Sequence, residues 1–136
     1  MPYSRLTNRL LSLSLVPMLL SVLAACSSLP GASAFQGEPD VVFQLTAENH
    51  EFVKDGEVNP TLTVTEGDRV GVELAVTEGR HDWYIEQFDA FTPFADSGET
   101  ESITFVANEA GTFDYYCSVS GHRELGMEGL FIVEPS

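Results

Sequence analysis

Four residues in the chain carry donor atoms that suit a soft metal ion: His81, Cys117, His122 and Met127. Four residues separate Cys117 from His122, and another four separate His122 from Met127. A glycine precedes each of the last two, and glycine lets a tight loop turn neighbouring side chains toward one point. Two imidazoles, a thiolate and a weakly held thioether are the donor set of blue-copper sites. The spacing therefore predicts a copper centre.

Each of these residues, taken alone, has an ordinary structural explanation. A buried cysteine is usually a small apolar residue, a methionine usually fills a core, and a histidine is usually a satisfied polar group. The joint pattern favours a metal site.

Zinc is disfavoured as the metal, because structural zinc sites use more Cys and His and no Met. The third histidine, His50, lies in a polar run and is expected to be a surface residue without a metal role.

The elements that must position these residues show an alternation of apolar side chains with a period of two, which is typical of strands. We expect strands around residues 41–45, 62–64, 70–76, 81–85, 103–105, 113–117 and 130–133. No segment shows a convincing helical period. Seven or eight short strands separated by Gly, Asp and Asn turns predict an all-β domain, a Greek-key β-sandwich over residues 40–136.

The same alternation indicates where the donors point. Phe113 and Tyr115 are expected to face the core, so Cys117 faces it too, at the inner end of its strand. His81 shares a face with Trp83. We therefore expect the cysteine and the histidine to meet at adjacent strand ends.

Residues 78–83 and 111–117, with the loop through Met127 and Gly129, resemble the cupredoxins, the family of plastocyanin, azurin and rusticyanin. The resemblance extends over residues 40–136, and the two spacers are closer to those of rusticyanin than of plastocyanin. It implies one copper ion, cycling between Cu(I) and Cu(II). The implied equatorial ligands are His81, Cys117 and His122, and the implied axial ligand is Met127.

The resemblance also implies roles around the metal. Asp82 would pin the ligand loop by hydrogen bonds, and the ring edge of His122 would reach the surface and pass the electron. Leu125 would belong to an apolar docking collar. Tyr116 is placed either for a second electron route or as an ordinary exposed tyrosine.

No position is left open for a substrate on such a metal, so we expect no enzymatic activity. The residues beside Cys117 are Tyr116 and Ser118, where copper nitrite reductases and multicopper oxidases have a histidine. The expected function is transfer of single electrons between redox partners. The alternatives are a copper carrier or storage protein, and a metal-free structural lipoprotein domain.

Residues 1–25 have the features of an export signal, with Arg5 and Arg9 ahead of a short apolar stretch. The end of this segment resembles a bacterial lipobox, which implies a lipid on Cys26; cleavage after residues 32–34 is the alternative. Residues 26–39, rich in Ser, Gly, Pro and Ala, predict a flexible tether. We expect an exported protein, periplasmic or on the cell surface, anchored through Cys26. Cys117 would then be a lone thiol, unless it pairs with Cys26 in a disulfide.

The chain has 21 acidic and 6 basic residues, a net charge of −15. Without its leader, which has two of the basic residues and no acidic one, the net charge is −17. Such a surface excludes nucleic acid as a partner. It would either steer a basic redox protein, such as a cytochrome or a terminal oxidase, or reflect a saline habitat. We expect a monomer that meets the membrane only through its lipid.

Overall fold

The computed structural model describes residues 37–136. The predicted signal peptide, the predicted lipidation site Cys26 and most of the predicted tether lie outside these residues. Among the residues that are described, no helix is long and apolar enough to cross a membrane. The one helical element in this described part of the chain is a single 3-10 turn, η1 (Glu86–Phe88).

The remaining elements are strands, as the alternation predicts. Those of four residues or more are β1 (Val41–Glu48), β2 (Glu51–Lys54), β4 (Leu62–Thr65), β5 (Arg69–Val76), β10 (Thr100–Val106), β11 (Gly111–Tyr116) and β12 (Glu128–Glu134). The two-residue strands are β3 (Glu57–Val58), β6 (Arg80–His81), β7 (Tyr84–Ile85), β8 (Ala90–Phe91) and β9 (Ala95–Asp96).

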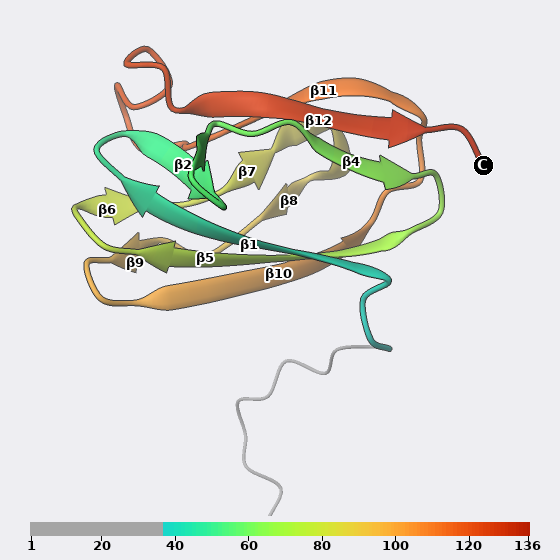
Figure 1. Ribbon diagram of the computed structural model, residues 1–136, viewed down its shortest axis with the longest axis horizontal. Helices are drawn as coiled ribbons and strands as arrows, with labels where there is room; N and C mark the ends of the chain where they lie inside the picture. The colour runs from blue at the N-terminus through green and yellow to red at the C-terminus, as the bar shows by residue number, and fades with distance from the viewer. Residues whose placement is uncertain (1–36) are drawn as a thin grey trace, which may run out of the picture. The chain divides into compact units, whose positions relative to one another are not determined.

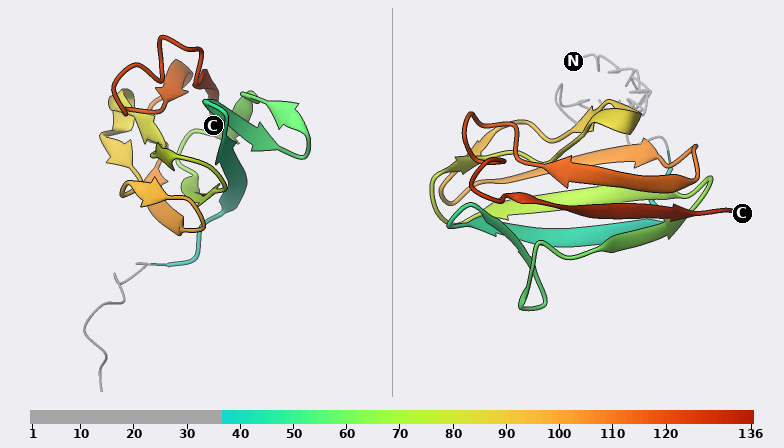
Figure 2. Two further views of the ribbon diagram at one scale, coloured as in Figure 1. Left: turned by 90° about the vertical axis from the view of Figure 1, so that its left-hand side faces the viewer. Right: turned by 90° about the horizontal axis from the view of Figure 1, so that it is seen from above.

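Two five-stranded sheets form a Greek-key β-sandwich (Figure 1). One sheet has the order β10-β5-β1-β2-β3 and the other has the order β4-β12-β11-β7-β8. β1 pairs in parallel with β5, β12 pairs in parallel with β4, and the other pairings are antiparallel. The two further views in Figure 2 show the long strands of the two sheets facing each other. A separate ribbon of β6 and β9 carries His81.

The core lies between the sheets and is rich in aromatic rings. Trp83 is fully buried and stacks on Tyr115, with 5.7 Å between ring centroids. Its ring also contacts Phe105 at 5.9 Å and Phe131 at 6.4 Å. Because both sheets contribute to this cluster, it fixes β11, which ends directly before Cys117, against the opposite sheet.

The structure differs from the predicted strand pattern in two places. The strand expected over residues 81–85 is two short pieces, β6 and β7, in different sheets. Between them the backbone of Trp83 bonds to Thr92, with its N–H donated to Thr92 Oγ1 at 3.0 Å and its carbonyl accepting from the Thr92 N–H at 3.0 Å. The other difference is a set of four short strands outside the expected ranges. Three of them, β3, β8 and β9, have two residues each, and the four residues of β2 bury only Phe52 and show no readable alternation.

Candidate metal centre

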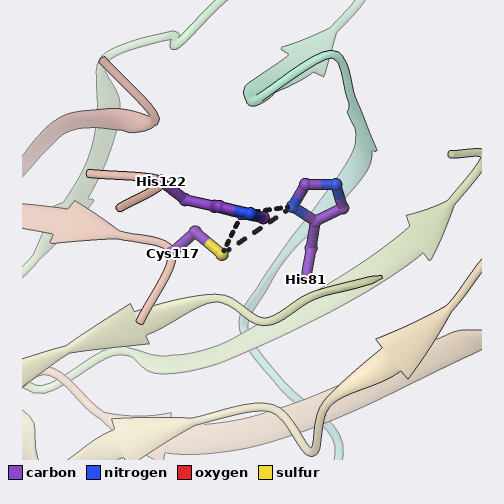
Figure 3. Close-up of side chains that lie close together, drawn as sticks. All are labelled: His81, Cys117 and His122. Atoms are coloured by element: carbon purple, nitrogen blue, oxygen red, sulfur yellow. Dashed lines mark hydrogen bonds between the residues drawn. The ribbon is translucent and has the colours of Figure 1, made fainter. Parts of the chain in front are cut away.

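His81, Cys117 and His122 point toward one another at one end of the sandwich (Figure 3). The Cys117 sulfur lies 3.8 Å from His81 Nδ1 and 3.5 Å from His122 Nδ1, and the two Nδ1 atoms are 3.2 Å apart. Donor atoms held at about 2.0–2.3 Å from one ion are themselves on the order of 3.3–3.8 Å apart. The spacing of the three donors therefore fits a single metal ion.

The ring of His81 is held in the tautomer that a metal needs. Its Nε2 lies 2.9 Å from the carbonyl oxygen of Glu78. A carbonyl can only accept, so Nε2 carries the proton and Nδ1 keeps its lone pair, directed at Cys117 and His122. His81 is 2% exposed and Cys117 is 1% exposed. These two donors are thus oriented and shielded from water.

The loop between Cys117 and Met127 is closed by its own backbone. The Cys117 N–H donates to the Met127 carbonyl at 3.1 Å, and the Met127 N–H donates to the His122 carbonyl at 3.1 Å. Gly121 and Gly126 have φ of +85° and +99°, the left-handed region that glycine adopts without strain. The Met127 side chain is fully buried at the end of this loop. The fold therefore brings all four predicted ligand residues to one end of the sandwich.

Asp82 connects the loop to the strand that carries His81. Its carboxylate accepts hydrogen bonds from the Ser118 N–H at 2.6 Å and from the Ser118 hydroxyl at 2.5 Å. Asp82 is 3% exposed, so these bonds lie in a shielded environment and position the residue after Cys117 relative to the residue after His81.

Burial sets the protonation of the three donors. It lowers the pKa of the His81 and His122 imidazoles, while it raises the pKa of the Cys117 thiol to about 11. Burial disfavours the charged form in each case. Without a metal the site thus holds two neutral imidazoles and a protonated thiol, and a bound cation would replace the thiol proton.

Of the two residues named for contact with partners, Tyr116 ends β11 and Leu125 lies within the ligand loop. Leu125 is 67% exposed, and its N–H donates to the His122 carbonyl at 3.2 Å. Tyr116 is half-buried; the guanidinium carbon of Arg123 lies 4.1 Å from its ring centroid, and the ring of Tyr84 packs edge-on at 5.2 Å. Tyr116 is therefore partly covered by its neighbours, whereas Leu125 is open to solvent beside a donor.

His50 is the residue whose position the sequence did not indicate. It is exposed, as expected, but its ring centroid lies 4.5 Å from that of His122 and 6.2 Å from that of His81. All three histidines of the chain thus gather in one place. His50 comes from the turn between β1 and β2, which is remote in sequence from the other donors, so no local spacing could have revealed it.

A family model described as copper binding proteins, plastocyanin/azurin family, matches residues 38–134. Among curated proteins, Auracyanin-A from Chloroflexus aurantiacus is 46% identical over 44 residues, which are 32% of this chain and 26% of that protein. The match thus spans about a quarter of the length of that relative.

Solved structures agree with the fold. Auracyanin B is similar with a TM-score of 0.60 and 18% identity, over 73% of this chain and 92% of that one. Auracyanin A, described as a "blue" copper protein from Chloroflexus aurantiacus, has a TM-score of 0.58 and 24% identity. The match covers 68% of this chain and 98% of that one. Copper nitrite reductase from Nitrosomonas europaea has a TM-score of 0.60 and 27% identity, over 71% of this chain but 41% of that one.

Proposed function

Because the chain belongs to the plastocyanin/azurin family of copper-binding proteins, we propose that it is an electron carrier that works outside the cytoplasm. One copper ion would be held by His81, Cys117 and His122, with Met127 as the weak fourth ligand. The observation that carries the proposal is the convergence of two Nδ1 atoms and one sulfur within 4.8 Å of one another. Copper in such a donor set supplies a one-electron couple between Cu(I) and Cu(II).

The contacts of the ligand residues should keep them in place when the copper ion gains or loses an electron. The Glu78 carbonyl holds the His81 ring, and Asp82 holds the start of the loop through Ser118. Backbone hydrogen bonds join Cys117, His122 and Met127 to one another. Since these contacts are made by groups that do not change protonation with the metal, we expect the donors to stay in place in both oxidation states. That is what rapid electron transfer requires.

We favour a carrier over an enzyme for two reasons. In the described residues, His81, Cys117 and His122 are the single group of three or more His, Cys, Asp or Glu that could hold a metal. The likeness to copper nitrite reductase covers 41% of that protein, and the neighbours of Cys117 here are Tyr116 and Ser118. A carrier needs one metal and a surface at which a partner docks.

Leu125 and His122 offer such a surface. Leu125 is 67% exposed next to a half-buried ligand, so a partner that covers Leu125 would come close to the metal. The net charge of −17 without the leader favours a partner with a basic surface, such as a cytochrome or a terminal oxidase. An association rate that falls as salt increases would support steering by this charge. A rate independent of salt would favour adaptation to a saline habitat.

Anchoring through Cys26 would keep the carrier next to a membrane. The wild-type protein should incorporate a labelled fatty acid, and the variant Cys26→Ala should not. A wild-type protein that takes up no labelled fatty acid would exclude the anchor.

The function is tested by adding Cu(II) to the metal-free protein. We expect an intense visible band with one ion per chain, lost in Cys117→Ser, and a reversible midpoint potential in voltammetry. A colourless protein that binds Cu(I) tightly and is not reversibly oxidised would support a copper carrier or storage protein instead. Equal melting temperatures with and without copper would support a metal-free structural domain, since binding to the native state raises the melting temperature.

A further inference from the structure

His50 occupies a turn that does not favour it. The β1–β2 hairpin is closed by Asn49 and His50, with φ of +48° and +61°. Two-residue hairpin turns with φ > 0 at both positions prefer Asn followed by Gly. A histidine there gives up some local stability, and residues in unfavourable backbone conformations often lie at functional sites. The position of this ring therefore calls for a functional explanation.

The distance between His50 and His122 suits two ligands of one ion. Their ring centroids are 4.5 Å apart, compared with 4.9 Å for His81 and His122. Two imidazoles that bind one ion through nitrogens at about 2 Å have ring centres on the order of 5 Å apart. His50 is nevertheless not part of the group formed by His81, Cys117 and His122. It is an exposed second imidazole beside His122.

A cavity of about 280 Å³ lies beside this outer pair and is also lined by His81. It is lined by residues 49–50, residues 78–81, Val119 and His122. Cys117 and His81 are 1% and 2% exposed, whereas His122 is half-buried and His50 is exposed. An ion that arrives from solvent therefore meets His50 and His122 before it can reach the other two donors.

The charges around the cavity also suit a cation. Glu78 lines it, and Glu48 and Glu51 flank the turn that carries His50. The one guanidinium in the lining, Arg80, is paired with Asp96 at 3.1 Å. The part of the cavity at His50 and His122 thus combines two imidazoles with the carboxylates of neighbouring residues.

We propose that His50 and His122 form an outer landing site for the incoming copper ion, which then passes to the inner site of His81, Cys117 and His122. In the transfer, a bond from the ion to His50 is replaced by bonds to His81 Nδ1 and Cys117 Sγ. The thiol proton of Cys117 leaves to water, and the ion keeps its oxidation state. His50 serves loading alone and is not a ligand of the loaded protein. This inference rests on the copper site proposed above.

Stopped-flow mixing of the metal-free full chain with Cu(II) tests the proposal. The matched variants are His50→Gly, which relaxes the turn and removes the imidazole, and Asn49→Gly, which relaxes the same turn and keeps it. We expect His50→Gly to slow the rise of the visible band at least about fivefold, because it removes the local capture of the ion. Asn49→Gly should load at the wild-type rate. Both variants should reach the wild-type final spectrum and midpoint potential.

Other results would overturn the proposal in distinguishable ways. Equal loading rates for His50→Gly and wild type would exclude the landing site while leaving the copper function intact. A changed final spectrum or potential in His50→Gly alone would make His50 part of the loaded site. A wild-type protein that forms no band at all would remove the proposed function itself, and the landing site with it.

A second measurement isolates the outer site. In His81→Ala/Cys117→Ser the inner site keeps only one of its three donors, and Zn(II) serves as a probe without redox chemistry. We expect Zn(II) to shift the NMR signals of the His50 and His122 rings in this variant, and the His122 shift to be lost when His50→Gly is added to it. A His122 shift that is the same in both would contradict binding by His50.

Discussion

Asp82 accepts two hydrogen bonds from Ser118, one from its backbone N–H at 2.6 Å and one from its hydroxyl at 2.5 Å. The two residues are 36 positions apart in the chain, and each directly follows a donor of the metal centre. One carboxylate thus sets the distance between the strand that carries His81 and the loop that starts at Cys117.

Removing the Asp82 carboxylate should therefore loosen the site. We expect Asp82→Ala to lower the free energy of unfolding of the metal-free protein by about 1–3 kcal/mol, since hydrogen bonds to a charged group are lost. Asp82→Asn, which keeps an acceptor for the N–H, should lose less. Urea denaturation measures both, and Ser118→Ala, which removes only the hydroxyl bond, is the control. Equal stability of Asp82→Ala and wild type would show that the contact does not hold the loop.

Asn59 should influence the metal from the far side of the loop. Its Nδ2 donates to the Gly126 carbonyl at 2.9 Å, and its Oδ1 accepts from the Phe52 N–H at 3.0 Å. Asn59→Asp keeps the acceptor and loses the donor, at a cost of about 0.5–1.5 kcal/mol. Because Gly126 precedes the buried Met127, we expect the midpoint potential of the copper form to shift.

The control for this prediction is Asn59→Gly, which keeps the left-handed backbone of residue 59 (φ +48°) and removes both bonds. It should shift the potential in the same direction as Asn59→Asp if the lost donor is the cause. An unchanged potential in both variants would mean that Asn59 supports only the hairpin of β2 and β3.

Copper binding should release close to one proton per ion at pH 7. The pKa of the Cys117 thiol is raised to about 11, so it is protonated in the metal-free protein, and the lowered pKa values of His81 and His122 leave both rings neutral. Anaerobic calorimetric titration with Cu(I), in buffers of different ionisation enthalpy, counts the protons. Cys117→Ser should release almost none.

The same titration at pH 6.5 tests the histidines separately. Two histidines with ordinary pKa values would each be about half protonated there and would raise the total to about two. With the lowered pKa values of His81 and His122, the number of protons released per copper ion should stay clearly below two. A value near two would contradict neutral imidazoles in the metal-free site.

Gly129 should tolerate no larger residue. In β12 it lies against the ring of the fully buried Tyr115, whose hydroxyl donates to the Pro60 carbonyl at 2.7 Å, and an added Cβ would collide with that hydroxyl. We expect Gly129→Ala to lower the free energy of unfolding by about 1–3 kcal/mol, the usual cost of overpacking. Leu130→Thr, at the exposed neighbour, should change it by no more than about 0.5 kcal/mol. Thermal denaturation that ranks the two variants in the opposite order would contradict this packing.

Much of the architecture could be predicted from the sequence because it depends on neighbours along the chain. The alternation in residues 70–76 predicts β5, since a strand with one buried face must bury every second side chain. The same rule places Cys117 on the inner face after Tyr115, and both are buried. The spacing of Cys117, His122 and Met127, with its glycines, likewise predicts a tight loop, and the backbone bonds that join these three residues are formed within that loop.

Tertiary structure decided the contacts between segments that have no fixed spacing. His50 reaches His122 because the β1–β2 turn lies beside the ligand loop once the sheets stack, and its polar sequence surroundings contain no sign of this. Asn59 meets Gly126, 67 residues later, for the same reason. The break between β6 and β7 arises because Trp83 pairs with Thr92 instead of extending a ladder. The sequence by itself thus determined the fold class and which residues could bind copper, because side-chain burial and loop spacing are local. Only the packing of the two sheets decided what surrounds these residues, because such contacts depend on how distant turns are brought together.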